Sequence, residues 1–208
     1  EIYTLSLHDA LPISIHPEAG SDVASLQTQA VKRDGNYSLS GTKRFISNAG
    51  IADYYVVFAS TEPDKKAKGI SAFIVDADAP GLIVKEKTAV MSPHPIGVIA
   101  FENCIVASGS LLGVEGEGLN IAYGTLDVLR CTVGAAAVGM AQRALEEAVR
   151  YCRERRQFGR AIGEFQGIRF MLADMATELE AARLLVYQAA WSQDGASPDA
   201  KRQSSMAK

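Results

Sequence analysis

Two kinds of hydrophobic pattern divide the chain. Between residues 23 and 112, short runs of β-branched and aromatic residues, such as those at 54–58 and 70–75, are separated by turn residues. Short strands without an intervening helical period are typical of a small antiparallel barrel or sandwich. From residue 119 onward, apolar residues recur every three or four positions, which predicts long amphipathic helices.

Turn residues indicate where the predicted strands begin and end. Asp34-Gly35, between the strand-like runs at 27–32 and 36–40, predicts a β-hairpin because both residues tolerate positive φ. Pro80-Gly81 predicts another turn, and residues 96–101 predict a further strand.

Two apolar stripes predict two long helices. The first comprises Leu119, Ala122, Tyr123, Leu126, Leu129, Val133, Ala137, Met140, Ala144, Ala148 and Tyr151. The second comprises Phe165, Ile168, Leu172, Met175, Leu179, Ala182, Val186 and Ala189. A short connection that contains Gly159 predicts an antiparallel pair, and Ser197-Pro198-Asp199 predicts the start of a third helix.

These patterns predict an α+β protein. We expect an antiparallel β-barrel or sandwich over residues 15–112, a glycine-rich linker over 113–118, and an up-and-down helical bundle over 119–208. The linker lacks the lysine and the hydroxyl residue of a phosphate-binding loop. Because a third helix is only starting at the end of the chain, we expect the bundle to be truncated. Residues 1–14 resemble a translated sequencing adapter and are expected to be a non-native tail.

Composition limits the binding partners and the cellular compartment that we expect for this protein. A formal charge of −3 gives no electrostatic reason to propose nucleic acid as a partner, and no apolar run reaches the roughly 18–20 residues that span a bilayer. Cys104, Cys131 and Cys152 are far apart and have no nearby histidine, which argues against a disulfide framework and a metal site. We therefore expect a cytoplasmic protein without a metal.

Several motifs occur in a fixed order along the chain. They are Pro-Glu-Ala-Gly-Ser-Asp at 17–22, Thr-Lys-Arg-Phe-Ile-Ser-Asn-Ala-Gly at 42–50, Leu-Asp-Val-Leu-Arg at 126–130, Glu-Arg-Arg-Gln-Phe-Gly at 154–159 and Ala-Asp-Met at 173–175. In order and spacing they resemble the acyl-CoA dehydrogenase family over roughly residues 15–208. The resemblance implies a β-barrel domain followed by a helical bundle, FAD as cofactor, and α,β-dehydrogenation of an acyl-CoA thioester. It also implies electron transfer to an electron-transfer flavoprotein and a homo-oligomer, a dimer or tetramer.

The resemblance also implies roles for individual residues. The cofactor-binding residues it implies are Pro17, Ala19, Gly20, Ser21, Phe45, Ile46, Ser47, Arg155, Phe158 and Gln166. The substrate-binding residues it implies are Ser21, Asp127 and Arg130. Arg155, Phe158 and Gln166 are expected to reach the FAD of a neighbouring subunit. A local ion pair between Asp127 and Arg130, and a core position for Phe45, are the alternatives to these roles.

The sequence departs from the family pattern at important positions. Ile15 and His16 stand where the family has a hydroxyl residue and a glutamate, and Phe45 replaces the usual tryptophan. A minority of the family carries its catalytic glutamate at the position of Leu129, and leucine accepts no proton. The base is therefore expected beyond Lys208, and we expect the chain by itself to be inactive. An acyl-CoA oxidase of the same fold and a catalytically dead FAD- or CoA-binding module are the alternative functions.

Overall fold

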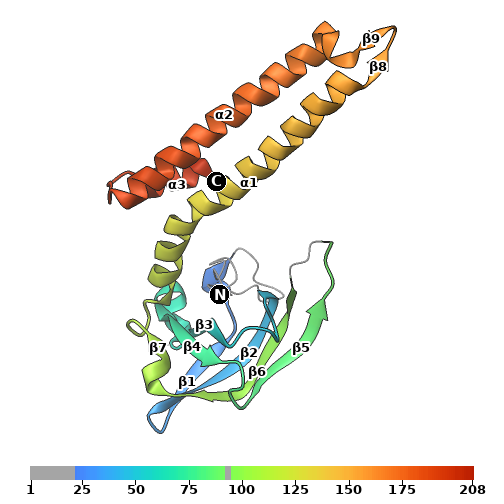
Figure 1. The fold of residues 1–208 in the computed structure, drawn as a ribbon. Helices are drawn as coiled ribbons and strands as arrows, with labels where there is room; N and C mark the ends of the chain where they lie inside the picture. The colour runs from blue at the N-terminus through green and yellow to red at the C-terminus, as the bar shows by residue number, and fades with distance from the viewer. Residues whose placement is uncertain (1–21, 92–94) are drawn as a thin grey trace. The chain divides into compact units, whose positions relative to one another are not determined.

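A computed structural model describes residues 22–91 and 95–208, which form two compact units. The first unit, called the β unit below, ends at Gly124, and the second, called the helical unit, begins at Thr125. Figure 1 shows that the first unit consists mainly of strands and the second mainly of helices. The predicted α+β fold class, a β domain followed by helices, is confirmed.

The β unit is built on a seven-stranded sheet in the order β5-β6-β2-β1-β3-β4-β7. Its strands are β1 Gln29–Arg33, β2 Asn36–Ser47, β3 Tyr54–Ser60, β4 Ile70–Asp76, β5 Leu82–Thr88, β6 Ile96–Val106 and β7 Leu111–Leu112. Short 3-10 helices lie at η1 Val23–Ser25, η2 Pro63–Gly69 and η3 Ser108–Ser110. Neighbouring strands run antiparallel, except that β1 meets β3 in parallel at Gln29 and Ser60.

Local turn chemistry explains the first hairpin. Asp34 and Gly35 connect β1 to β2 with φ values of 48° and 79°, as a two-residue turn with positive φ at both positions requires. The predicted hairpin is therefore present. Strand β5 was not predicted, because Lys85, Glu86 and Lys87 interrupt its hydrophobic pattern; charged residues are common on a strand at the edge of a sheet.

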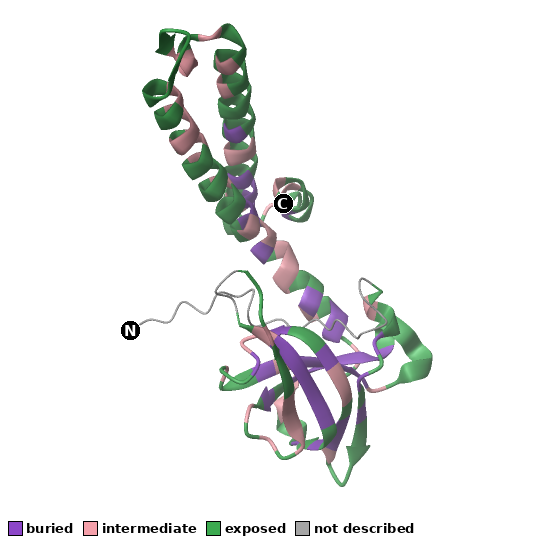
Figure 2. Cartoon of the chain, turned by 90° about the vertical axis from the view of Figure 1, so that its right-hand side faces the viewer, coloured by how far each residue is buried: buried purple, intermediate pink, exposed green. Residues whose placement is uncertain are grey.

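Two apolar clusters fill the β unit. The larger cluster lies among the inward-facing side chains of the strands and includes Leu39, Val57 and Phe73. The second joins Phe58 and Ile70 to the first turns of helix α1 (Gly118–Glu154). Figure 2 shows that the buried positions of this unit follow the strands.

The helical unit contains a long helical hairpin. Helices α1 (Gly118–Glu154, whose first turns belong to the β unit) and α2 (Gln166–Asp194) lie side by side in Figures 1 and 2. Their connection holds two short strands, β8 (Arg156–Gln157) and β9 (Arg160–Ala161), and the 3-10 helix η4 (Ile162–Glu164). Helix α3 (Ala200–Ala207) begins slightly later than predicted.

Each predicted stripe is buried only in part. On α2, Leu179, Val186 and Ala189 are buried as predicted, whereas Met175 is exposed. On α1, Leu119 and Leu129 are buried, but Met140 and several other stripe residues are exposed. Gly134, which was not in the stripe, is buried against α2 and α3. Alanine and glycine make α1 apolar on more than one face, so periodicity alone does not determine which face meets α2.

Helix α1 bears on the expectation that no segment of the chain spans a membrane. By length and composition alone, it is the one helix in the described ranges that satisfies the criteria for crossing a bilayer. One such helix is weak evidence, because core helices of water-soluble proteins satisfy the same criteria.

Candidate functional site

A bulge in β2 turns an aromatic ring toward the surface. The register of β2 against β6 shifts between Lys43 and Ile46, so that Arg44 and Phe45 lie in the bulge. Phe45 has φ of 53° and is 54% exposed. Positive φ is strained for a bulky residue. Phe45 therefore does not occupy the core position that was its alternative, and its ring is accessible to a ligand.

The two residues after Phe45 differ in what they present. The Ile46 side chain is buried in the larger core cluster, and its backbone pairs with Gly97 of β6. Ser47 is half-buried at the end of β2. The cofactor contact proposed for each of these residues stays a prediction.

A tyrosine fixes the turn that follows β2. The Tyr55 hydroxyl accepts a hydrogen bond of 2.8 Å from the Gly50 amide and donates one of 3.2 Å to the Asn48 carbonyl oxygen. The Asn48 amide donates to the carbonyl oxygen of Pro95 at 2.8 Å. These bonds connect the end of β2 to the beginnings of β3 and β6.

Lys43 lies on the inner side of the same bulge. Its Nζ donates a hydrogen bond of 2.6 Å to the Phe58 carbonyl oxygen, and the residue is 2% exposed. Burial lowers the pKa of Lys43 from 10.5 to about 7. Sequence reasoning gave this lysine no role, although its inward position in the alternating pattern of β2, after Tyr37 and Leu39, was a usable signal.

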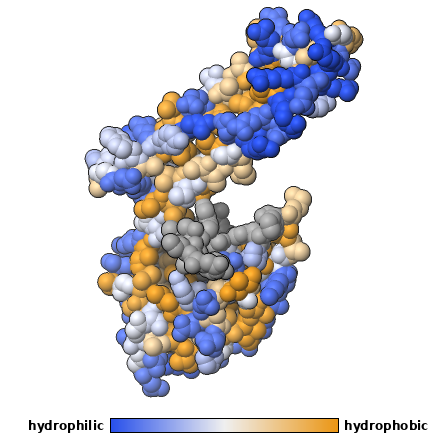
Figure 3. Space-filling view, viewed as in Figure 1, coloured by the Kyte–Doolittle hydropathy of each residue, from blue (hydrophilic) through white to orange (hydrophobic). Residues whose placement is uncertain are grey.

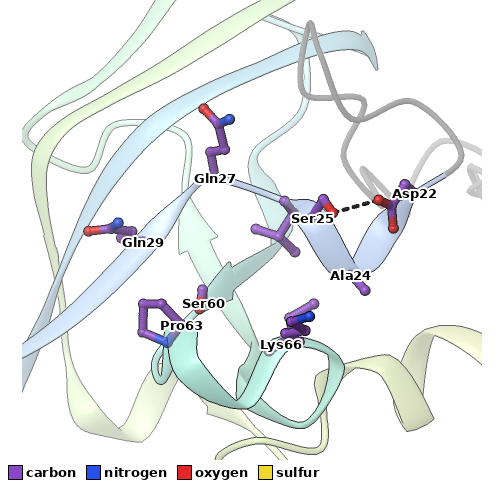
Figure 4. A pocket seen from close by; sticks show the side chains of 10 residues that line it. Asp22, Ala24, Ser25, Gln27, Gln29, Ser60, Pro63 and Lys66 are labelled. Atoms are coloured by element: carbon purple, nitrogen blue, oxygen red, sulfur yellow. Dashed lines mark hydrogen bonds between the residues drawn. The ribbon is translucent and has the colours of Figure 1, made fainter.

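A pocket of about 620 Å³ with a mixed polar and apolar lining lies at the start of the described chain (Figure 4). It is lined by Asp22, Ala24, Ser25, Leu26, Gln27, Gln29, Ser60, Pro63, Lys66 and Ile70. The Ser25 hydroxyl donates a hydrogen bond to the Asp22 carboxylate at 2.5 Å. Lys66, at φ 49°, supplies a cation to the lining. The pocket was not predicted, because residues distant in sequence form it.

The first group of predicted ligands directly precedes this pocket in sequence. Pro17, Ala19, Gly20 and Ser21 lie outside the described residues, as do Ile15 and His16. Their proposed contacts with cofactor and substrate therefore stay predictions.

Asp127 and Arg130 form an ion pair on one face of α1. The Arg130 guanidinium also donates to the Ser205 hydroxyl at 3.3 Å, and Lys201 lies 3.7 Å from the Asp127 carboxylate. Residues of α3 thus contact both partners, and the local ion pair that was the alternative to substrate binding is present in this chain. Neighbouring Leu129 is buried and offers no proton acceptor.

The three remaining predicted residues gather at the β8–β9 end of the helical hairpin. Arg155, Phe158 and Gln166 are all exposed, Phe158 at 93%. The Phe158 and Phe165 rings meet edge to face at 6.1 Å, and the Arg160 guanidinium lies 4.1 Å from the centre of the Phe165 ring. Sequence reasoning missed the contribution of Arg160. Figure 3 shows hydrophilic residues concentrated at this end of the helical unit.

The geometry at this end suits an anionic ligand with a planar group. Phe158 and Gly159 form the two-residue turn between β8 and β9, with φ values of 53° and 79°. The turn leaves the Phe158 ring exposed, and the exposed Arg155 and Arg160, close to it in sequence, carry guanidinium groups suited to phosphate. All these groups are open to solvent, so a ligand held by them requires a further surface to enclose it.

Both units match domains of known proteins. The family model for the acyl-CoA dehydrogenase middle domain matches residues 16–104, and the model for the acyl-CoA dehydrogenase C-terminal domain matches residues 116–208. An acyl-CoA dehydrogenase of Bacillus subtilis strain 168 is 49% identical over 176 residues, which are 84% of this chain and 46% of that protein. The chain spans about half the length of the curated relatives it matches.

Solved structures agree in fold. A chain of the structure described as "Electron transferring flavoprotein of Acidaminococcus fermentans: Towards a mechanism of flavin-based electron bifurcation" is 44% identical, with a TM-score of 0.88 over 93% of this chain and 52% of that one. The structure described as "FAD complex of PigA" is 36% identical, with a TM-score of 0.88 over 93% of this chain and 51% of that one. Together with the two family models, these similarities establish that the chain belongs to the acyl-CoA dehydrogenase family.

Proposed function

We propose that the protein containing this chain is an FAD-dependent acyl-CoA dehydrogenase that oxidises the α,β bond of an acyl-CoA thioester. The observation that carries the proposal is the exposed, outward-turned ring of Phe45 on a bulge within a motif that resembles the flavin-lining segment of the family. When bound, FAD supplies the hydride acceptor of the reaction at N5. The chain's own residues bind, orient and shield the reactants.

The residues of the β unit fit one face of a flavin. The Phe45 ring provides an apolar plane, and the Ser47 hydroxyl, two residues later, can donate or accept a hydrogen bond. The bonds of Tyr55 to Asn48 and Gly50 hold the following turn in place. A fixed aromatic plane lowers the entropic cost of stacking a ring upon it.

The exposed end of the helical hairpin fits the anionic part of the cofactor. The complex of FAD with the related PigA supports FAD as the ligand. Arg155 and Gln166 would bind its pyrophosphate and adenosine parts, and Phe158 would pack against them. Because these residues are all solvent-exposed, we propose that they meet the FAD of a neighbouring subunit in a homo-oligomer.

Acyl-CoA binding is proposed for residues of the helical unit. In the helical unit, Asp127 and Arg130 offer a carboxylate and a guanidinium to the pantetheine and nucleotide parts of CoA. The name of the Bacillus subtilis relative supports an acyl-CoA as the substrate.

Proton removal is assigned to a residue beyond Lys208. Abstraction of the α-proton requires a carboxylate or another base within hydrogen-bond distance of it. Leu129, at the position that carries the base in some relatives of this family, is buried and apolar. We therefore propose that the chain alone binds reactants without turning them over. Electron-transfer flavoprotein is the proposed acceptor, supported by the Acidaminococcus fermentans structure.

Anaerobic reduction of the complete protein tests this function. The protein is reconstituted with FAD and mixed with acyl-CoA thioesters of increasing chain length, and the visible flavin absorbance is followed. We expect addition of a thioester to bleach the flavin. We expect the reduced flavin to be reoxidised by electron-transfer flavoprotein, and only slowly by oxygen. Rapid oxygen consumption would instead indicate an acyl-CoA oxidase. Retention of FAD without bleaching by any thioester would indicate a catalytically dead binding module.

A further inference from the structure

We propose that Lys43 is a positioning residue: its hydrogen bond to the Phe58 carbonyl oxygen holds the bulge of β2 so that Phe45 stays turned outward. The inference rests on the proposed function only for what Phe45 then meets, namely the flavin. The hydrogen bond itself and its effect on β2 are properties of the β unit and are independent of any ligand.

The pairing of β2 and β3 through β1 is incomplete. Strand β1 lies between β2 and β3 but pairs with β2 over five residue pairs only, and it meets β3 in register at Gln29 and Ser60 alone. The part of β2 that carries Lys43 and the part of β3 that carries Phe58 lie outside these pairings. The Lys43 side chain joins these two parts with a bond of 2.6 Å.

The surroundings of the Lys43 amine leave almost no room for water. Beside Lys43 lies a void of about 10 Å³, which is lined by Ile46, Tyr55, Val57, Ile99 and Phe101. A void of this size is at the lower limit for holding one water molecule. The Phe58 carbonyl oxygen is therefore the main partner of the amine, and a buried amine without that partner is strongly unfavourable.

A lysine is an unusual residue at the buried position 43. Apolar side chains fill the cores of strand proteins, and a fully buried lysine is rare because its charged form is poorly solvated there. A methionine would occupy similar space without this cost. A lysine at this position is therefore better explained by the directional bond that it makes than by the volume that it fills.

Lys43 anchors one end of the bulge that carries Phe45. Lys43 and Ile46 both point inward and flank the bulge, while Arg44 and Phe45 between them are exposed. Ile46 is held by apolar packing, and Lys43 is held by its bond to Phe58. Because Phe45 has the strained φ of 53°, release of one anchor allows the backbone to relax and the ring to leave its outward position.

The test compares three variants of the complete protein. Lys43→Met and Lys43→Gln both shorten the side chain by one atom, but Lys43→Met removes the donor whereas Lys43→Gln keeps one. Lys85→Met, on the exposed edge strand β5, is the matched control. For each variant, amide hydrogen exchange is measured for peptides that cover residues 44–48 and for peptides that cover β4. FAD affinity and the visible absorption and circular dichroism of bound flavin are also measured.

The expected result is a local effect. In Lys43→Met, residues 44–48 should exchange roughly two- to tenfold faster, the factor that corresponds to one net hydrogen bond, while β4 is unchanged. FAD affinity should fall by a similar factor with an altered flavin spectrum. Lys43→Gln should restore part of both properties, and Lys85→Met should resemble the wild type.

Each other outcome overturns the proposal or separates it from the proposed function. Unchanged exchange at residues 44–48, or equally faster exchange in β4, would show that Lys43 has no specific effect on the bulge. Failure of both Lys43 variants to fold would assign the lysine to general stability and would also refute the proposal. If wild-type protein binds no FAD, the proposed function fails, and the exchange difference still decides the role of Lys43.

Discussion

The Lys43 amine and the Phe58 carbonyl oxygen are joined by a 2.6 Å hydrogen bond inside the core of the β unit. Burial lowers the pKa of Lys43 from 10.5 to about 7, whereas in the unfolded chain it returns toward 10.5. Between these values the unfolded state binds more protons than the folded state. The unfolding free energy should therefore rise with pH across this window, at most by about 1.4 kcal/mol per pH unit, and be lowest below pH 7.

Urea unfolding of the wild type and Lys43→Met at several pH values from 6.5 to 10 checks this prediction. The wild type should gain stability relative to Lys43→Met as the pH rises, because methionine does not titrate. Near pH 7 the methionine variant should be at least as stable as the wild type, since it avoids burying an ammonium group. Parallel stability curves for the two proteins would contradict the assigned pKa.

Arg155 is predicted to contribute to FAD binding, and Arg153 is not. Both are exposed near the end of α1, so Arg153→Gln is a matched control for the loss of one positive charge. Arg155→Gln should weaken FAD binding by roughly tenfold or more, the effect of losing one hydrogen bond to a charged group. Fluorescence titration of the complete apoprotein with FAD measures this. Equal losses in both variants would indicate only a diffuse electrostatic attraction.

Asp127 is predicted to serve both the substrate and the fold. Asp127→Asn should raise the KM for acyl-CoA roughly tenfold, equivalent to about 1.4 kcal/mol, and lower the melting temperature because Arg130 and Lys201 lose their charged partner. Asp199→Asn, which disrupts an exposed pair with Arg202, is the control and should change neither property. Lower stability with unchanged KM in steady-state kinetics would leave Asp127 with the structural role alone.

Two glycines of α1 should respond oppositely to alanine. A Cβ atom at Gly134 would lie 2.5 Å from the Ala207 carbonyl oxygen and 2.8 Å from Val186, whereas one at Gly139 would meet nothing within 4 Å. Gly134→Ala should therefore cost about 1–3 kcal/mol through overpacking, and Gly139→Ala should add about 0.5–1 kcal/mol through helix propensity. Thermal unfolding measures both. Stabilisation by Gly134→Ala would mean that the three helices do not approach this closely.

The chain by itself is predicted to self-associate through its helical unit. Large apolar side chains are exposed on α2, among them Leu184, Tyr187 and Trp191, the last at 78%. Exposed apolar surface of this kind favours association. Light scattering during size-exclusion chromatography should show species larger than a monomer, and Trp191→Glu should shift them toward the monomer. A wild-type chain that elutes as a monodisperse monomer at all concentrations would refute the prediction.

The sequence by itself determined the elements whose signals are local. Asp34 and Gly35 define a hairpin because both residues readily adopt positive φ, and the apolar stripe of α2 identifies the face that is buried at Leu179 and Val186. The ordered motifs were also sufficient for the resemblance to the family, and the family models agree with it.

Only the tertiary structure decided the features that depend on distant residues. The outward turn of Phe45 results from a register shift against β6, and the altered pKa of Lys43 results from burial among strands far apart in sequence. The contacts of α3 with Asp127 likewise join residues more than seventy positions apart, as the bond from Ser204 shows. Alternation and spacing report the average preference of a segment for burial, whereas exposure, strain and protonation depend on which other segments pack against it.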